Sequence, residues 1–232
     1  IKATTNEEFT NRLKPVYNAI TRTSQSNLLN DKDLIGFAGA PWTILVYMIN
    51  KMSPKNGLPE IFFDDPNLIN DLLNTIEKFV KLHIKNQINA GANVIQIFDS
   101  WAGLLEDRIS EYIYQPTFNI VEYVKKLGVP IICFPRGIKD YKEFCEIVKP
   151  DMISIDYAVD PHEIVKNIKI PVQGGLDPKF LLSDKDNLKK EVEKYLTIFK
   201  DHPYTFNLGH GILPEAKIDL VTTLINTVRK FK

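Results

Sequence analysis

The sequence contains little cysteine and little arginine, and each shortage excludes something. Its two cysteines, Cys133 and Cys145, lack the paired spacing of a zinc site or a redox motif. We expect them to be free, buried thiols, as in the reducing cytoplasm. A bidentate clamp for a carboxylate needs arginine, so few places on this chain can supply one. The arginines are Arg12, Arg22, Arg108, Arg136 and Arg229.

The sequence also lacks a membrane segment and an excess of either charge. Its longest largely apolar run, Gly36 to Ile49, is too short to span a bilayer and is broken by Pro41. No signal peptide is recognisable. Lysine plus arginine and aspartate plus glutamate number 29 each, so no global field attracts nucleic acid or an anionic membrane. We therefore expect neither as a partner. Because the chain starts at Ile1, we expect the native start to lie upstream.

Several catalytic motifs are missing as well. The sequence has no Gly-x-Ser-x-Gly elbow, no Walker loop and no Gly-x-Gly-x-x-Gly after an apolar run. The histidines, His83, His162, His202 and His210, are scattered, and neither cysteine has a histidine at ligand spacing. We expect no metal site.

What is present indicates an α/β fold. Short, almost continuously apolar runs predict strands buried on both faces, and helical patterns separate them, as in parallel βαβ units. The predicted strands are Leu34–Ala38, Val94–Phe98, Pro130–Phe134, Met152–Asp156, Pro171–Gln173 and Tyr204–Leu208. Without a repeat or a flexible linker, residues 1–232 are interpreted as a single domain. Two architectures stay open: an open doubly wound sheet, or a (β/α)8 barrel whose first two strands precede Ile1.

Proline and glycine mark the expected helix ends. Asp65-Pro66 begins a helix that Gly91 closes, and Pro214 is expected to begin a helix that runs to the C-terminus. A helix near the N-terminus is expected to start near Thr5 and to be interrupted by Pro15. The remaining predicted helices are Glu111–Leu127, Tyr141–Val148, one that starts at Asp160-Pro161 with Glu163 in a capping box, and a short one that starts at Asp177-Pro178.

Ligands of parallel α/β proteins bind at the carboxyl ends of the strands, so the residues that follow each run are the candidates for a site. Glycines, hydroxyls, aromatic rings and a histidine gather there, which suits a pocket for a flat or polar small molecule. The segments are Gly39–Thr43 with Tyr47, Asp99–Gly103, Pro135–Gly137, Asp156-Tyr157, Gly174–Pro178 and Gly209–Gly211.

Each candidate also has a structural interpretation. Tyr47 is also interpreted as a core aromatic residue of a helix whose hydroxyl has a partner nearby, Ser100 as a helix cap and Arg136 as a brace for a loop. Asp99 and Asp156 are either a carboxylate pair for acid–base chemistry or acceptors that order their loops. The glycine turns, including the one around His210, suit a phosphate as well as a carboxylate.

The segments at the strand ends, taken in order, resemble the signatures of the uroporphyrinogen decarboxylase family. The resemblance rests on Gly36–Thr43 with Tyr47, on Gln96–Gly103, on Gln173–Pro178, and on Phe206–Glu215, with Asp156–Pro161 similar as well. In the segment that is usually Asn-Leu-Asp-Pro, Gly175 replaces the asparagine.

The resemblance implies a (β/α)8 barrel of which about six of the eight βα units lie in this chain. It implies a cytoplasmic homodimer that removes CO2 from the four acetate side chains of uroporphyrinogen III to give coproporphyrinogen III, without metal or organic cofactor. By analogy with the family, Tyr47, Ser100 and His210 contact the substrate, and Phe98 belongs to the apolar wall. Arg136 is a further candidate for the pocket wall.

The resemblance also exposes a difference. The family's Arg-Gln-Ala-Gly-Arg clamp, and the aspartate that binds the pyrrole NH groups, have no counterpart in this sequence, so no catalytic residue is assigned here. We expect the chain as printed to have lost most of its decarboxylase activity. Two alternatives remain: zinc-dependent methyl transfer from corrinoids to thiols, as in the same superfamily, and a non-catalytic porphyrin-binding remnant.

Overall fold

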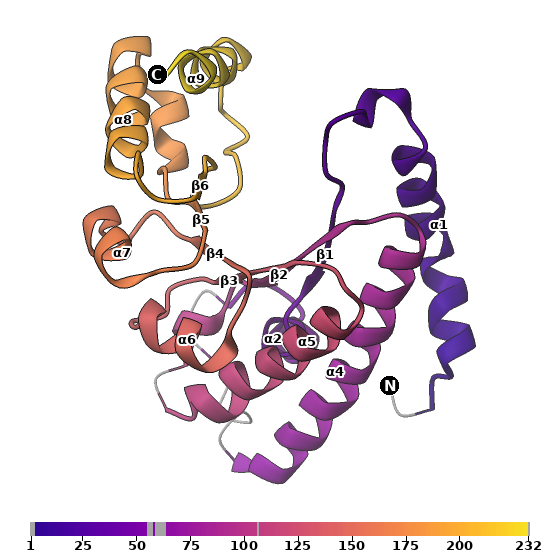
Figure 1. Ribbon diagram of the computed structural model, residues 1–232. Helices are drawn as coiled ribbons and strands as arrows, with labels where there is room; N and C mark the ends of the chain where they lie inside the picture. The colour runs from indigo at the N-terminus through magenta and orange to yellow at the C-terminus, as the bar shows by residue number, and fades with distance from the viewer. Residues whose placement is uncertain (1–2, 55–57, 59–63, 106, 232) are drawn as a thin grey trace. The chain divides into compact units, whose positions relative to one another are not determined.

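The computed structural model describes residues 3–54, 58, 64–105 and 107–231 (Figure 1). It divides into two compact units. The first unit contains residues 1–139 and 146–150, and the second contains residues 140–145 and 151–232. Each unit is built from parallel strands that alternate with helices, as the alternation in the sequence predicts.

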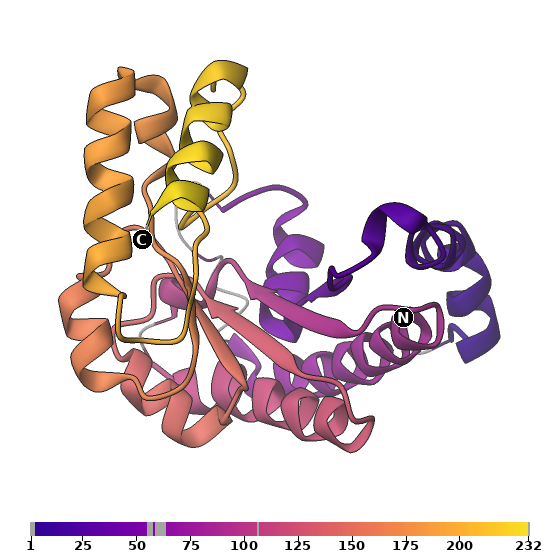
Figure 2. The ribbon, with the colours of Figure 1, turned by 45° about the horizontal axis from the view of Figure 1, so that its top comes forward.

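The first unit contains three parallel strands in chain order, β1 (Ile35–Gly39), β2 (Val94–Asp99) and β3 (Ile131–Pro135). Its helices are α1 (Asn6–Ser24), α2 (Pro41–Asn50), α4 (Pro66–Asn89) and α5 (Gln115–Lys126). Short turns of helix lie at Asn27–Leu29, Ala102–Leu104 and, in π form, Ser110–Tyr114. Helices α2, α4 and α5 pack against the strands, and α1 runs beside α4 (Figures 1 and 2).

The second unit contains the parallel strands β4 (Met152–Ile155), β5 (Val172–Gly174) and β6 (Tyr204–Thr205). Its helices are α7 (Pro161–Asn167), α8 (Lys185–Ile198) and α9 (Ile218–Lys230), with a 3-10 helix at Pro178–Leu182. Helices α8 and α9 lie side by side (Figure 2). Helix α6 (Tyr141–Val148) has residues in both units. Strand follows strand in chain order within each unit, which is the order of a (β/α) barrel.

The sequence signals at the ends of α4 are confirmed. The carboxylate of Asp65 accepts a hydrogen bond from the backbone N–H of Leu68 at 3.0 Å, and Pro66 occupies the first turn, where no N–H is needed. After α4 ends, Gly91 has a φ of 114°, a conformation that favours glycine. Helix α4 buries its apolar residues against α1, α2, α5 and β1, including Ile69, Leu73, Ile76, Phe79, Val80 and Ile84.

Two predictions about proline are wrong. Pro15 does not interrupt the first helix, since α1 runs without a break from Asn6 to Ser24. The helix starts with a capping box between Thr5 and Glu8. Proline has no N–H to donate to the carbonyl one turn earlier in the helix. Because Pro15 is exposed, water can donate to that carbonyl instead. Pro214 does not begin the last helix: it lies in a turn, and α9 begins at Ile218.

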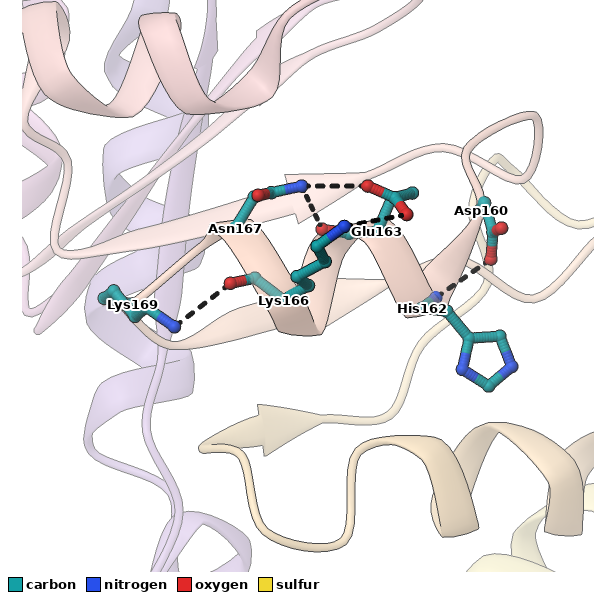
Figure 3. Close-up of polar contacts among 6 residues, drawn as sticks. All are labelled: Asp160, His162, Glu163, Lys166, Asn167 and Lys169. Carbon is teal, nitrogen blue, oxygen red and sulfur yellow. Dashed lines mark hydrogen bonds and ion pairs between the residues drawn. The ribbon is translucent and has the colours of Figure 1, made fainter.

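The capping box predicted at Asp160 forms only in part (Figure 3). The carboxylate of Asp160 accepts a hydrogen bond from the backbone N–H of His162 at 2.9 Å. The carboxylate of Glu163, however, accepts from Asn167 at 3.0 Å and lies 3.7 Å from the amine of Lys166. The glutamate therefore supports the following turn of α7 instead of the helix start.

Candidate functional site at the carboxyl ends of the strands

In the first unit, the strand register brings most of the candidate residues to one edge. Gly39 of β1 pairs with Phe98 of β2, and Asp99 pairs with Pro135 of β3. The residues that follow these positions, Ser100 and Arg136, are therefore neighbours just beyond the end of the sheet. Their loops are also joined, because the backbone N–H of Arg136 donates to the carbonyl of Asp99 at 3.1 Å.

Tyr47 is not the core residue that the structural interpretation expects. It is 43% exposed, and its ring meets the ring of Trp101 edge-on, with 5.9 Å between centroids. Its hydroxyl has no hydrogen bond to any residue that the structure describes. Helix α2 starts with Pro41 in its first turn and ends at Lys51, which adopts the left-handed conformation. Helix α2 thus holds the ring of Tyr47, and the hydroxyl of Tyr47 is available to a ligand.

The side chains of Ser100 and Arg136 have no hydrogen bond or ion pair to any residue that the structure describes. Ser100 is half-buried and does not cap the helical turn that follows, whose N-cap is Trp101. Arg136 does brace a loop, but with its backbone: its carbonyl accepts from the N–H of Gly103 at 2.9 Å. Among the described residues its guanidinium has no ion pair. Both side chains suit contacts with an anionic ligand.

An aromatic row backs these residues. Phe98 meets Phe37 of β1 on one side and Phe134 of β3 on the other, each at 6.0 Å between centroids and nearly perpendicular. The family resemblance points to Phe98, but nothing in the sequence points to Phe37 or Phe134. Only the register across β1, β2 and β3 shows that the three rings are contiguous, although each lies in an apolar run of the sequence. Phe37 is 62% exposed, so the row includes an open apolar surface.

Asp99 belongs to a buried cluster behind the edge. Its side chain is 3% exposed, and its Oδ1 accepts a hydrogen bond from the hydroxyl of Thr43 at 2.6 Å. Its Oδ2 has no partner among the described residues. Burial raises the pKa of Asp99 to about 7, against the smaller opposing effect of the bond from Thr43. The loop-ordering interpretation of Asp99 therefore fits its contacts.

In the second unit, His210 follows β6 as predicted. Its Nδ1 accepts a hydrogen bond from the backbone N–H of Gly211 at 2.6 Å, so a neutral ring carries its proton on Nε2. The imidazole is exposed. The preceding Gly209 lies against the loop after β4, where an added Cβ would stand 2.4 Å from the backbone nitrogen of Tyr157. This contact joins the His210 turn to the Asp156 loop.

The neighbouring glycine pair is fixed by two buried tyrosines. The hydroxyl of Tyr195 donates to the carbonyl of Gly175 at 2.8 Å, and that of Tyr204 donates to the carbonyl of Gly174 at 2.7 Å. Burial raises the pKa of both phenols, which keeps them protonated donors. Gly175 has a φ of 104°, and a Cβ there would lie 2.7 Å from the ring of Tyr195. The glycine that replaces the family's asparagine therefore fits its own surroundings.

Asp156 also orders a loop in the second unit. Its Oδ1 accepts from the backbone N–H of Ala158 at 2.8 Å, and its Oδ2 accepts from the hydroxyl of Tyr141 at 3.2 Å. Burial, and next the charge of Asp156, raise the pKa of Tyr141. The two aspartates that the sequence offered as an acid–base pair each have local partners in their own units.

The first unit also contains an apolar cavity of about 490 Å³ between α1, β1, α2 and α4. Its lining includes Arg12 and His83, while Tyr47, Phe98, Ser100 and Arg136 do not line it. Burial lowers the pKa of His83, and the hydroxyl of Tyr17 lies 3.1 Å from its Nδ1. Phe37 and Gly39 also line the cavity, so it adjoins the aromatic row at one end of the candidate edge.

The described residues form neither a metal-binding cluster nor a membrane-spanning helix. Within the ranges that the structure describes, no three histidine, cysteine or acidic side chains form a group able to hold a metal ion. The ring of His162 points away from the other labelled residues of α7 (Figure 3). No described helix is long and apolar enough to cross a membrane.

The comparisons with known proteins agree first on a fold class. The chain matches the structure of a methyltransferase from Methanosarcina mazei with a TM-score of 0.73 at 16% identity, over 94% of this chain and 64% of that one. It matches a B12-independent methionine synthase from Shewanella sp. W3-18-1 with a TM-score of 0.57, also at 16% identity, over 91% of this chain and 66% of that one. At this identity the likeness concerns the fold alone, an α/β architecture of βα units.

The family follows from sequence. The model of the family described as "Uroporphyrinogen decarboxylase (URO-D)" matches residues 1–231. A uroporphyrinogen decarboxylase of Wolbachia pipientis wMel is 37% identical over 229 residues, which cover 97% of this chain and 67% of the relative. One of Rickettsia bellii is also 37% identical, over 95% of this chain and 67% of the relative. The chain belongs to the uroporphyrinogen decarboxylase family and spans about two thirds of the length of these relatives.

Proposed function

We propose that the chain forms part of a cofactor-independent decarboxylase that converts uroporphyrinogen III to coproporphyrinogen III in tetrapyrrole (haem) biosynthesis. The observation that carries this proposal is the edge of the first unit, where an aromatic row lies beside polar side chains that have no hydrogen bond or ion pair to any described residue. Family membership over residues 1–231 supports both the reaction class and the treatment of the chain as one domain.

The proposed chemistry needs an electron sink in the substrate. Protonation of a pyrrole α-carbon makes the ring cationic. The bond between the acetate methylene and its carboxylate then breaks, CO2 leaves, and the electron pair enters the ring. Proton addition to the resulting methylene and proton loss from the α-carbon give a methyl group. The protein has to position the ring and balance charge, which preorganised donors do well.

Each candidate residue has a role in this proposal. The ring faces the aromatic row at Phe98, which supplies apolar contact for a flat macrocycle. Tyr47 and Ser100 donate hydrogen bonds to substrate carboxylates, and Arg136 pairs with one. By analogy with the family, His210 contacts a further carboxylate.

We also propose that a polypeptide of residues 1–232 alone binds uroporphyrinogen III but has lost most of its decarboxylase activity. The reason is internal to the sequence: of its few arginines, only Arg136 follows a strand at the candidate edge, while the substrate is rich in carboxylates. The family resemblance further implies a cytoplasmic homodimer. Sedimentation of the purified protein at micromolar concentration tests the dimer, and a monomer at these concentrations would oppose it.

Uroporphyrin III, the stable oxidised form of the substrate, tests the site by fluorescence titration. We expect saturable binding that weakens about tenfold in Tyr47→Phe and in Arg136→Gln, because each loses one carboxylate contact. Tyr123→Phe on α5 and Arg22→Gln in the last turn of α1 make the same chemical changes elsewhere and should bind normally. Absence of saturable binding to the unchanged protein, or equal loss in the controls, would reject the proposed site.

A further inference from the structure

Helix α2 holds the loop after β2 by three hydrogen bonds from two consecutive residues. The hydroxyl of Thr43 donates to Oδ1 of Asp99 at 2.6 Å and accepts from the backbone N–H of Trp101 at 3.2 Å. The indole Nε1 of Trp42 donates to the backbone carbonyl of Trp101 at 3.1 Å. Both backbone groups of Trp101 are thus fixed by one helical turn. A hydroxyl has one proton to donate, and that of Thr43 is committed to Asp99.

These bonds connect two residues of the proposed site. Tyr47 lies one helical turn after Thr43, on the same face of α2, and Ser100 directly precedes Trp101. The ring of Tyr47 also rests edge-on against Trp101. Any movement of the Trp101 backbone relative to α2 would therefore change the spacing between the phenol and the serine hydroxyl.

We propose that Thr43 is a positioning residue that sets the spacing between Tyr47 and Ser100, with Asp99 orienting its hydroxyl. This inference rests on the proposed function. Thr43 and Asp99 are both buried and reach the ligand only through their neighbours. The arrangement follows the general rule that contacts with a ligand are precise only when a second layer of bonds fixes them.

A substitution of Thr43 can remove its hydroxyl and keep the shape of its side chain. Valine has nearly the shape of threonine but no hydroxyl, so Thr43→Val removes both bonds and leaves the N–H of Trp101 and Oδ1 of Asp99 unpaired. Thr43→Ser keeps the hydroxyl, and Thr43→Cys keeps only a weak donor and acceptor. Thr117 in α5 is the matched control, because its buried hydroxyl has no partner among the described residues.

Tryptophan fluorescence can report on this cluster without an added label. The chain has two tryptophans, Trp42 and Trp101, and both belong to this cluster. Tryptophan emission and its quenching by acrylamide therefore report on the linked segment in the folded protein. A residue that only adds stability would change the unfolding midpoint but would leave these signals, and ligand affinity, unchanged while the protein is folded.

The experiment compares the full chain with its variants under conditions in which each is folded. We expect Thr43→Val to increase quenching and to weaken uroporphyrin III binding about tenfold, and Thr43→Ser to stay within about twofold of the unchanged protein. Thr117→Val should change neither signal. Thr43→Cys should fall between serine and valine, and it replaces the valine variant if that variant does not fold.

Wild-type affinity in a folded Thr43→Val or Thr43→Cys variant, in a protein that does bind uroporphyrin, would overturn the positioning role. Failure of the unchanged protein to bind uroporphyrin would instead remove the proposed function. In that case the quenching experiment still decides whether Thr43 holds the loop: unchanged quenching in the variants would overturn the link itself.

Discussion

The side-chain amide of Gln87 forms two hydrogen bonds with the backbone of Phe37. Its Nε2 donates to the carbonyl of Phe37 at 2.8 Å, and its Oε1 accepts from the N–H of the same residue at 3.0 Å. Gln87 lies near the end of α4 and is 2% exposed. A helix side chain thus satisfies the backbone groups of β1 as a neighbouring strand would. This contact fixes the strand that carries one end of the aromatic row.

Gln87→Leu should lower the free energy of unfolding by about 1–2 kcal/mol, because it removes two part-buried hydrogen bonds to the backbone of Phe37. Urea unfolding followed by circular dichroism measures the change. Gln115→Leu is the control, since the exposed Gln115 of α5 donates from its amide to the side chain of Asn119 and to no backbone group of the described residues. An effect of equal size in both variants would contradict a special role for the pair of Gln87 and Phe37.

Asp99 should make stability fall as the pH rises towards neutrality. Burial raises its pKa from the ordinary 3.8 to about 7, so the folded protein keeps a proton that the unfolded chain releases near pH 4. The resulting stabilisation is complete below pH 4 and is lost as the pH rises through about 7. Each unit of pKa difference corresponds to about 1.4 kcal/mol, so the effect is on the order of a few kcal/mol.

Asp99→Asn removes this titration and keeps an acceptor for Thr43. We expect the free energy of unfolding of the variant to vary less between pH 4 and pH 8 than that of the unchanged protein. Asp201→Asn, at an exposed turn, should retain the original pH dependence. If the Asp99→Asn protein shows the same slope as the unchanged protein, Asp99 does not titrate in this range.

Local signals in the sequence explain which elements were predicted well. Helix α4 has its aspartate cap, its first-turn proline and its closing glycine within the same stretch, and α6 is observed with the predicted bounds. Signals of one residue alone were less informative. Pro15 and Pro214 were each given a role by type, but whether proline breaks, begins or merely occupies an element depends on exposure and on neighbouring caps. Helix α8 was missed, although Asp184 caps its start.

The candidate site divides in a similar way. Glycines, aromatic residues and hydroxyls after apolar runs predict a site at this edge. Among the described residues, the side chains of Tyr47, Ser100 and Arg136 have no hydrogen bond or ion pair, and their contact with a ligand stays a prediction. The partners of Phe98 and the bonds of Thr43 depend on register between strands and on how a helix packs against a loop. Those relations join residues that lie far apart in the sequence, such as Thr43 and Asp99, and no local pattern of residues specifies them.

Pro15 leads to a further stability prediction. An interior proline deprives the helix of one hydrogen bond and strains the preceding turn, at a cost of about 3 kcal/mol relative to alanine. Pro15→Ala should therefore raise the unfolding midpoint. The rise is smaller than this cost implies, because alanine also gives the unfolded chain more conformational freedom. Asn18→Ala, at another exposed position of α1, should raise the midpoint by much less. A lower midpoint in Pro15→Ala would show that the ring makes contacts that outweigh this cost.

Gly209 and Gly211 flank His210 but differ sharply in the space around them. An added Cβ at Gly209 would lie 2.4 Å from the nitrogen of Tyr157 and 2.8 Å from the carbonyl carbon of Asp156, whereas one at Gly211 would meet nothing within 4 Å. Backbone cannot yield as a flexible side chain does. Gly209→Ala must therefore displace the histidine turn from the loop after β4, at a cost of about 1–3 kcal/mol in stability.

The same displacement should weaken uroporphyrin binding if His210 contacts the ligand. We expect Gly209→Ala to lose about tenfold in affinity under conditions in which it stays folded, and Gly211→Ala to bind and unfold like the unchanged protein. Titration and thermal unfolding of the two variants side by side separate the effects, because both introduce the same methyl group beside the same histidine. Equal affinity in the two variants would mean that the position of His210 relative to the Asp156 loop does not matter for binding, and that His210 contributes little to the proposed site.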